Sequence, residues 1–233
     1  GTTMHIAGGT VNSTNVVAET NMEIADGTIK ATNVNAGAAM DITGGIINAA
    51  HLVAGTTMTI SGATVNTGAG DGLVQAASIT MSKGQVHGSD LTITASGDYK
   101  QSGGSIATTG ALKLNADNAT INGGEVSAND AAITAQKDFA FSGDKLNVNN
   151  ELQLSANNAT ISGGEISAND AIITAQKDFA FSGDKLNINN ELQLNANNAT
   201  ISGGEIGTKS AVVNVANYTQ STGTVNISDA LDM

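Results

Sequence analysis

The stretch DFAFSGDKL occupies residues 138–146 and occurs again, letter for letter, at residues 178–186. The two copies contain all four phenylalanines of the chain, Phe139, Phe141, Phe179 and Phe181. They lie within a longer duplication, because residues 118–157 and 158–197 differ at only five positions. A period of this length is typical of repeat proteins, in which stacked units share a continuous core. The structure of one unit therefore decides the fold.

A shorter period of about 20 residues underlies the longer one. Each unit has an anchor position, then a glycine-rich pair two and three residues later, and an apolar residue five residues later. The anchors are Ile6, Ile24, Ile42, Ile60, Met81, Gln101, Ile121, Phe141, Ile161, Phe181, Ile201 and Gln220. Apolar residues alternate with others around each anchor, as in Phe139-Ala140-Phe141, and this alternation is typical of a strand with one buried face.

Strands this short bury a face only when neighbouring units stack on them. We therefore expect an all-β fold, a right-handed parallel β-helix (β-solenoid) of about 12 coils of 18–21 residues. Residues 1–233 are expected to be a single β-solenoid segment, in which 118–157 and 158–197 are two-coil repeats. Because the pattern begins in mid-unit, we interpret the chain as a fragment of a longer repeat protein.

Stacked coils place equivalent residues above one another, so the core is expected to alternate in volume. The positions two before the anchor are Ala119, Phe139, Ala159, Phe179 and Ala199, and the anchors are Ile121, Phe141, Ile161, Phe181 and Ile201. Each ring then lies next to smaller side chains in the layers above and below. This alternation explains a repeat of two coils, and recent gene duplication without selection for alternation is the other explanation.

The fourth residue after the anchor alternates in charge along the same coils. This charged column consists of Glu125, Lys145, Glu165, Lys185 and Glu205. Stacked strands lie about 4.8 Å apart, so opposite charges are expected to be neighbours. Exposed pairs are worth less than about 1 kcal/mol each. We therefore expect the column mainly to fix the register of the coils.

The corners between strands have their own residue types. The glycine pairs, such as Gly123-Gly124, permit the positive φ of a tight bend. Asp144 and Asp184 replace the second glycine in two coils and are expected to tolerate the same turn. Asn118, Asn158 and Asn198 lie at another corner, where stacked amides can form hydrogen bonds along the axis.

Composition excludes several classes of function. The net charge of −12 opposes binding to nucleic acid and to anionic membranes. There is no cysteine, so disulfides and thiolate metal sites are excluded. No apolar run approaches the roughly 20 residues that span a bilayer, and the start GTTMHIAGGTV is not a signal peptide. We expect no cofactor.

Metal sites are not expected. The three histidines, His5, His51 and His87, occupy different offsets in their units and share no stripe. The glycine-rich nonapeptide of calcium-binding β-solenoids is absent, and SANDA at 127–131 and 167–171 supplies one acid per turn.

Paired carboxylates could serve a glycosidase. Candidates are Asp130 with Asp170 and Asp144 with Asp184, each pair two coils or about 9.6 Å apart. These pairs arise from the repeat itself, and no insertion builds a cleft around them, so we expect no catalysis. Only residues 66–74, NTGAGDGLV, enlarge a coil slightly, and any site is most expected there.

Units such as DYKQSGGSIATTGALKLNAD (98–117), with cores such as NATISGGEI, resemble the repeats of filamentous-haemagglutinin-type exoproteins. These are the large secreted partners of bacterial two-partner secretion, and they include adhesins and contact-dependent inhibition toxins. The resemblance covers the whole chain with degenerate motifs, and the amino-terminal secretion domain of the family is missing. It implies a right-handed parallel β-helix in the stalk of a surface-exposed or released fibre.

The function expected from these features is that of a structural rod in a large bacterial extracellular protein. Its partners would be neighbouring coils of the parent chain or other copies bound end to end, an outer-membrane secretion partner, and a receptor on a host or neighbouring cell. Nucleic acid is not an expected partner. One alternative is a self-assembling fibre or surface-layer subunit, because open solenoid ends are unpaired strand edges. The other is a carbohydrate-active β-helix enzyme, which would need clustered acidic or basic residues on irregular loops.

Overall fold

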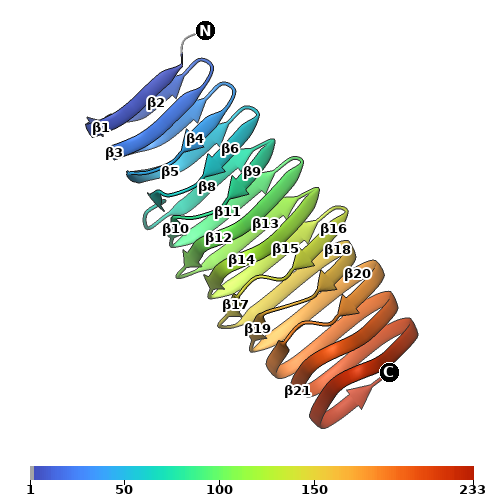
Figure 1. Cartoon of the computed structure of the whole chain (residues 1–233). Helices are drawn as coiled ribbons and strands as arrows, with labels where there is room; N and C mark the ends of the chain where they lie inside the picture. The colour runs from blue at the N-terminus through green and yellow to red at the C-terminus, as the bar shows by residue number, and fades with distance from the viewer. Residues whose placement is uncertain (1–2) are drawn as a thin grey trace.

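The computed structural model describes residues 3–233, which form strands and no helix. The coils stack into one rod that runs from the N-terminus to the C-terminus (Figure 1). Paired strands are parallel, and each strand pairs with the equivalent strand one coil further along. The chain is therefore an all-β parallel β-solenoid, as the sequence predicts.

The strands follow one another with short connections. They are β1 (Met4–Asn12), β2 (Asn15–Ala18), β3 (Met22–Ala36), β4 (Met40–Ile42), β5 (Ile46–Ala54), β6 (Thr57–Ile60), β7 (Thr64–Asn66), β8 (Asp71–Ala76), β9 (Ser78–Met81), β10 (Gln85–Gly88), β11 (Asp90–Ala95), β12 (Asp98–Thr108), β13 (Ala111–Ala116), β14 (Asn118–Ala128), β15 (Asp130–Ala135), β16 (Asp138–Phe141), β17 (Lys145–Val148), β18 (Glu151–Ile161), β19 (Glu165–Ala168), β20 (Asp170–Phe181) and β21 (Lys185–Asp232). The longest strands bend around corners, so one strand contributes to more than one face.

Strand pairing stacks the anchors in the order read from the sequence. The registers connect Ile6, Ile24, Ile42, Ile60, Met81, Gln101, Ile121, Phe141, Ile161, Phe181 and Ile201. Ten steps join these eleven residues, so the paired part of the rod has about ten turns. The predicted count of about 12 coils is slightly too high for this part.

Each turn has three faces, which the turn at residues 138–157 illustrates. β16 forms the anchor face, β17 the second face and the first half of β18 the third face. Along each strand the exposed fraction alternates, so every second side chain points inward. The inward residues Phe141 and Leu146 are both 0% exposed. Complete burial of such a side chain is worth about 1.5–3 kcal/mol, and the stacked turns add these contributions along the rod.

The glycine corners need a backbone conformation that other residues rarely adopt. Gly124 has a φ of 78°, and a Cβ at this position would collide with the carbonyl oxygen of Gly104. Glycine at the third place after the anchor therefore allows both the turn and the close approach of the preceding coil.

Two corners differ from the prediction. No residue other than glycine has a positive φ within the described residues, so the expectation that Asp144 and Asp184 share the glycine conformation is wrong. Asp144 instead extends its carboxylate to the preceding coil, where Oδ2 accepts the N–H of Gly124 at 3.0 Å. Asp184 accepts the N–H of Gly164 in the same way at 3.1 Å. Each aspartate thus caps the glycine turn of the preceding coil.

Candidate functional site

The four phenylalanines lie in the core. Phe139 and Phe179 are each 1% exposed, and Phe141 and Phe181 are 0% exposed. Strand pairing places Phe139 between Ala119 and Ala159, and Phe179 between Ala159 and Ala199. It places Phe141 between Ile121 and Ile161. Rings and smaller side chains therefore alternate along the anchor face in this register.

The alternation extends to whole turns, which the anchor face alone does not reveal. The inward residues of one turn are Ala119, Ile121, Val126, Ala128, Ala131, Ile133 and Ala135. Those of the next turn are Phe139, Phe141, Leu146, Val148, Leu152, Leu154 and Ala156. Small turns and large turns therefore follow one another on all three faces. The sequence already contained this alternation of small and large residues at the inward positions of the second and third faces.

The charged column lies on the outer side of the second face. Strand pairing sets Glu125 beside Lys145, Lys145 beside Glu165, and Glu165 beside Lys185. None of the ion pairs within residues 3–233 involves this column; they join His5 to Glu23, Lys100 to Asp98, and Lys137 to Asp117. The charges are therefore neighbours in register without direct contact. Their effect on register stays a prediction.

A second column combines aspartate and asparagine at the corner before the anchor face. This amide column consists of Asp98, Asn118, Asp138, Asn158, Asp178, Asn198 and Asn217. Asn118 Nδ2 donates to Asp98 Oδ1 at 2.9 Å, and Asn158 donates likewise to Asp138 at 2.7 Å. The predicted hydrogen bonds along the axis are present, but the asparagines mostly donate to aspartate and not to one another. Asn118 and Asn158 also each separate two carboxylates that would otherwise repel each other.

The electrostatics of this column are clearest at Asp98. The hydrogen bond from Asn118 lowers the pKa of the Asp98 carboxyl group, and the Lys100 ammonium lowers it further. Lys100 Nζ lies 3.0 Å from Asp98 Oδ2. The carboxylate form of Asp98 is therefore favoured by its partners in the folded chain.

The carboxylates considered for catalysis serve the backbone. Asp130 Oδ1 accepts the N–H of Glu151 at 3.4 Å, and Asp170 Oδ1 accepts the N–H of Glu191 at 3.2 Å. Glu151 is also in register with Asp170, so acidic side chains line this edge of the third face. A shallow hollow of about 350 Å³ runs beside them. These aspartates thus act as corner caps, each for the coil that follows it.

Metal ligation has little basis in the geometry. No group of three or more His, Cys, Asp or Glu side chains is placed to hold a metal ion in the range 3–233. His51 Nδ1 donates to Asn33 Oδ1 at 2.8 Å, and Asn33 Nδ2 donates to Asn15 Oδ1 at 2.7 Å. This histidine therefore belongs to a polar ladder along the axis, one coil per step.

The enlarged coil at residues 66–74 folds back onto the rod. Thr67 is 3% exposed, and its Oγ1 and backbone N–H both donate to the carbonyl oxygen of His87. Gly72 and Gly88 leave the room that this side chain fills, because a Cβ at either position would collide with it. Thr67 therefore fills the corner, and residues 68–71 are exposed.

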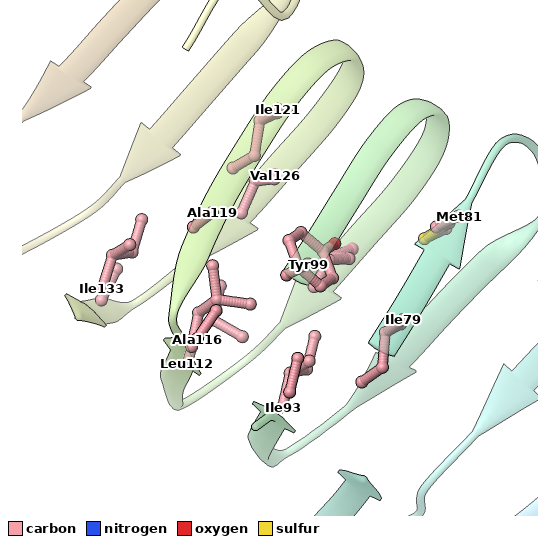
Figure 2. Packing of buried hydrophobic residues seen from close by; sticks show 14 of the residues in the cluster. Ile79, Met81, Ile93, Tyr99, Leu112, Ala116, Ala119, Ile121, Val126 and Ile133 are labelled. Atoms are coloured by element: carbon pink, nitrogen blue, oxygen red, sulfur yellow. The ribbon is translucent and has the colours of Figure 1, made fainter. Parts of the chain in front are cut away.

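A polar pair inside the core was missed as a pair by the sequence reasoning, which noted only a glutamine at an anchor. Tyr99 Oη donates to Gln101 Oε1 at 2.8 Å, and both residues are 1% exposed. Figure 2 shows Tyr99 between the strand of Ile79 and the strand of Ala119. Burial raises the pKa of the Tyr99 hydroxyl. The spacing Tyr-x-Gln, with both residues on one face of a strand, is the signal that could have found it.

No protein-family model matches this sequence, and comparisons with curated proteins and with solved structures found no similar chain. Residues 3–233 contain no helix that could span a membrane.

Proposed function

We propose that this chain is a structural rod, a stalk segment of a large bacterial extracellular fibre of the adhesin type. Its task is to project or scaffold other parts of the fibre, without catalysis. The observation that carries the proposal is an uninterrupted core along the rod. Between the described strands no connection is longer than residues 67–70, and that one is packed against the rod by Thr67. Long loops, which build most active sites, have no place in this arrangement.

The polar side chains support the same reading. The aspartates that repeat along the rod, such as Asp130 and Asp144, accept backbone N–H groups of adjacent coils. The amide column joins successive coils in a similar way. A side chain whose hydrogen-bonding capacity holds two coils together is better suited to a rigid spacer than to chemistry on a substrate.

The resemblance to filamentous-haemagglutinin repeats supplies the biological setting of the proposal. It favours the bacterial cell surface or the extracellular space as the location. It also favours an outer-membrane secretion partner and a receptor on a host or neighbouring cell. The absence of cysteine suits export without disulfides.

Immunogold labelling of the producing bacterium tests this proposal. An antibody against residues 118–197 is applied to intact cells and to lysed cells, with a strain that lacks the gene as control. We expect gold particles on intact cells, at a distance from the outer membrane. Labelling that requires lysis would contradict an extracellular stalk.

The enzyme alternative is tested on the purified chain with a panel of polysaccharides. We expect no depolymerisation. If the chain degrades a polysaccharide and the Asp130→Asn, Asp170→Asn double variant does not, the structural role is wrong and the chain is a carbohydrate-active enzyme. Asp41→Asn provides a matched control, because Asp41 lies on the outer side of the anchor face, away from the candidate aspartates.

A further inference from the structure

The charged column alternates in sign over consecutive coils of the second face. Its first four members point outward from β14, β17, β19 and β21; they are Glu125, Lys145, Glu165 and Lys185. The strand pairing that stacks them has no bulge, so their backbones form a regular row with a spacing of about 4.8 Å. The second face therefore presents an ordered pattern of charge to any surface that meets it.

These four charges have no partner within the described chain. In residues 3–233, none of the four side chains takes part in an ion pair or a side-chain hydrogen bond. Glu205, the fifth member of the column, differs, because its Oε1 accepts a hydrogen bond from Asn226 Nδ2 at 3.3 Å. The row that is open to a second molecule thus consists of four charges.

An alternating row with an even number of charges is complementary to its own reversed copy. A twofold axis between the coils of Lys145 and Glu165 sets Lys145 against Glu165 of the second copy. The same axis sets Glu125 against Lys185 of the second copy. A twofold axis along the rod would instead set every charge against itself. The alternation therefore favours antiparallel rods over parallel ones.

The neighbouring positions fit the same antiparallel arrangement. The outward column two residues further along each strand alternates between serine and asparagine; it consists of Ser127, Asn147, Ser167 and Asn187. Reversal places each serine opposite an asparagine, which can donate to it or accept from it. At the preceding corner, Asp144 lies opposite Gly164 of the second copy, so the aspartates of this corner do not face one another.

We propose that the second face binds the second face of another copy of this chain, with the two rods antiparallel and the four charges of each copy paired with those of the other. The contact is isologous, so it closes as a dimer. Glu205 lies opposite the neutral Ser105 of the second copy, so no like charges meet along the column. Stalks that project from two facing cells run in opposite directions, so this dimer would link such cells. That last consequence alone rests on the proposed stalk function.

Sedimentation equilibrium of the purified chain, from micromolar to millimolar concentration at low salt, tests the proposal. We expect the weight-average mass to rise towards twice the monomer mass and no further. Added salt should weaken the dimer, because single exposed ion pairs are weak and screened.

Two double variants rearrange the four charges without changing the composition or the net charge of −12. Glu165→Lys with Lys185→Glu gives the order Glu, Lys, Lys, Glu, which sets like against like in the dimer. Lys145→Glu with Glu165→Lys gives the order Glu, Glu, Lys, Lys, which keeps opposite charges together. Both create the same number of like neighbours within their own column. We expect the first variant to stay monomeric and the second to dimerise like the parent chain.

Cross-linking tests the orientation, because the chain has no cysteine of its own. A thiol-specific cross-linker that spans about 10 Å, the spacing of facing sheets, is added to single-cysteine variants. We expect it to join Ser127→Cys to Asn187→Cys when the two are mixed. Ser127→Cys alone should not be joined, since its two thiols are offset by three coils, about 14 Å along the rod.

A parent chain that stays monomeric over the whole range overturns the proposal. Association that the variant with Glu165→Lys and Lys185→Glu retains also overturns it, as does cross-linking of Ser127→Cys alone, which indicates parallel rods. If either double variant melts early, Glu125→Gln with Lys185→Gln replaces it, and we expect a dimer about tenfold weaker; an unchanged dimer overturns the proposal. Failure of the dimer leaves the stalk function intact, because immunogold labelling measures location and not pairing.

Discussion

At the scale of the residue, the phenylalanine rings fill the core of the large turns and stabilise the fold. We expect Phe141→Ala to lower the free energy of unfolding by about 3–5 kcal/mol, because the small turns on either side do not fill the cavity. Denaturant unfolding measures the loss. Ser142→Ala is the matched control, since Ser142 is the exposed neighbour. An unchanged midpoint for Phe141→Ala would falsify the role of alternating turns in stability.

The charged column has a weaker effect, which depends on salt. Lys145→Glu places a third carboxylate between Glu125 and Glu165. We expect a loss below about 1 kcal/mol that grows as ionic strength falls. Thermal melting at low and high salt measures it, and Lys145→Gln separates the loss of attraction from added repulsion. Equal melting temperatures for all three proteins at low salt contradict a role for this column.

We expect low pH to remove the contribution of Asp98, in the amide column, to the stability of the fold. The hydrogen bond from Asn118 and the charge of Lys100 lower the pKa of Asp98 from its ordinary value of 3.8. A group whose pKa is lower in the folded state stabilises the fold above 3.8, and this contribution disappears as the pH falls through the lowered pKa. We expect the NMR titration midpoint of the Asp98 carboxyl carbon below 3.8, and a shift towards that value in Asn118→Ala. An Asp98 midpoint that does not respond to Asn118→Ala contradicts this account.

The sequence identified residues of the charged column and of the amide column, but not all of their contacts. Period and alternation identify inward positions, so Phe139 and Phe141 could be placed in the core before the structure. The partner of a side chain depends on rotamers and corner geometry, which one sequence does not specify. Asp144 illustrates this limit, because its carboxylate reaches back to Gly124 and its own φ is ordinary.

At the scale of the element, the corners decide whether one coil can lie on the next. Gly124→Ala introduces a Cβ at a φ of 78° and against the carbonyl of Gly104. We expect a loss of at least about 1–2 kcal/mol from the left-handed conformation alone. Gly70→Ala is the control, because nothing lies within reach of a Cβ there. Denaturant unfolding compares the two, and equal stability would show that the corner relaxes.

The elements themselves were largely predictable, because strand, corner and strand recur with constant spacing. The exceptions lie where spacing changes. The coil with residues 66–74 gains residues, and these place Thr67 in the corner. A glycine-rich insertion in a sequence does not reveal whether it folds inward or outward, since glycine permits both.

At the scale of the whole molecule, the duplication makes the length of the rod adjustable. Deleting residues 118–157 joins Asp117 to Asn158, which recreates the natural Asp117–Asn118 junction. Ala159 and Ile161 then stack on Tyr99 and Gln101 in place of identical residues. The shortened chain should keep the same kinds of layers and lose only two of them.

Deleting only residues 118–137 removes one small turn and leaves two large turns in contact. Phe139 would then lie on Tyr99 and Phe141 on Gln101, so large side chains would meet along the anchor face. Overpacking of this kind typically costs about 1–3 kcal/mol at each crowded site. We expect the 40-residue deletion to melt near the parent chain and the 20-residue deletion to melt far below it. Small-angle scattering should show the 40-residue deletion shorter by about 9.6 Å, two strand spacings. Similar stability for both deletions would mean that the layers tolerate any order, and the period of 40 residues would then be a record of gene duplication alone.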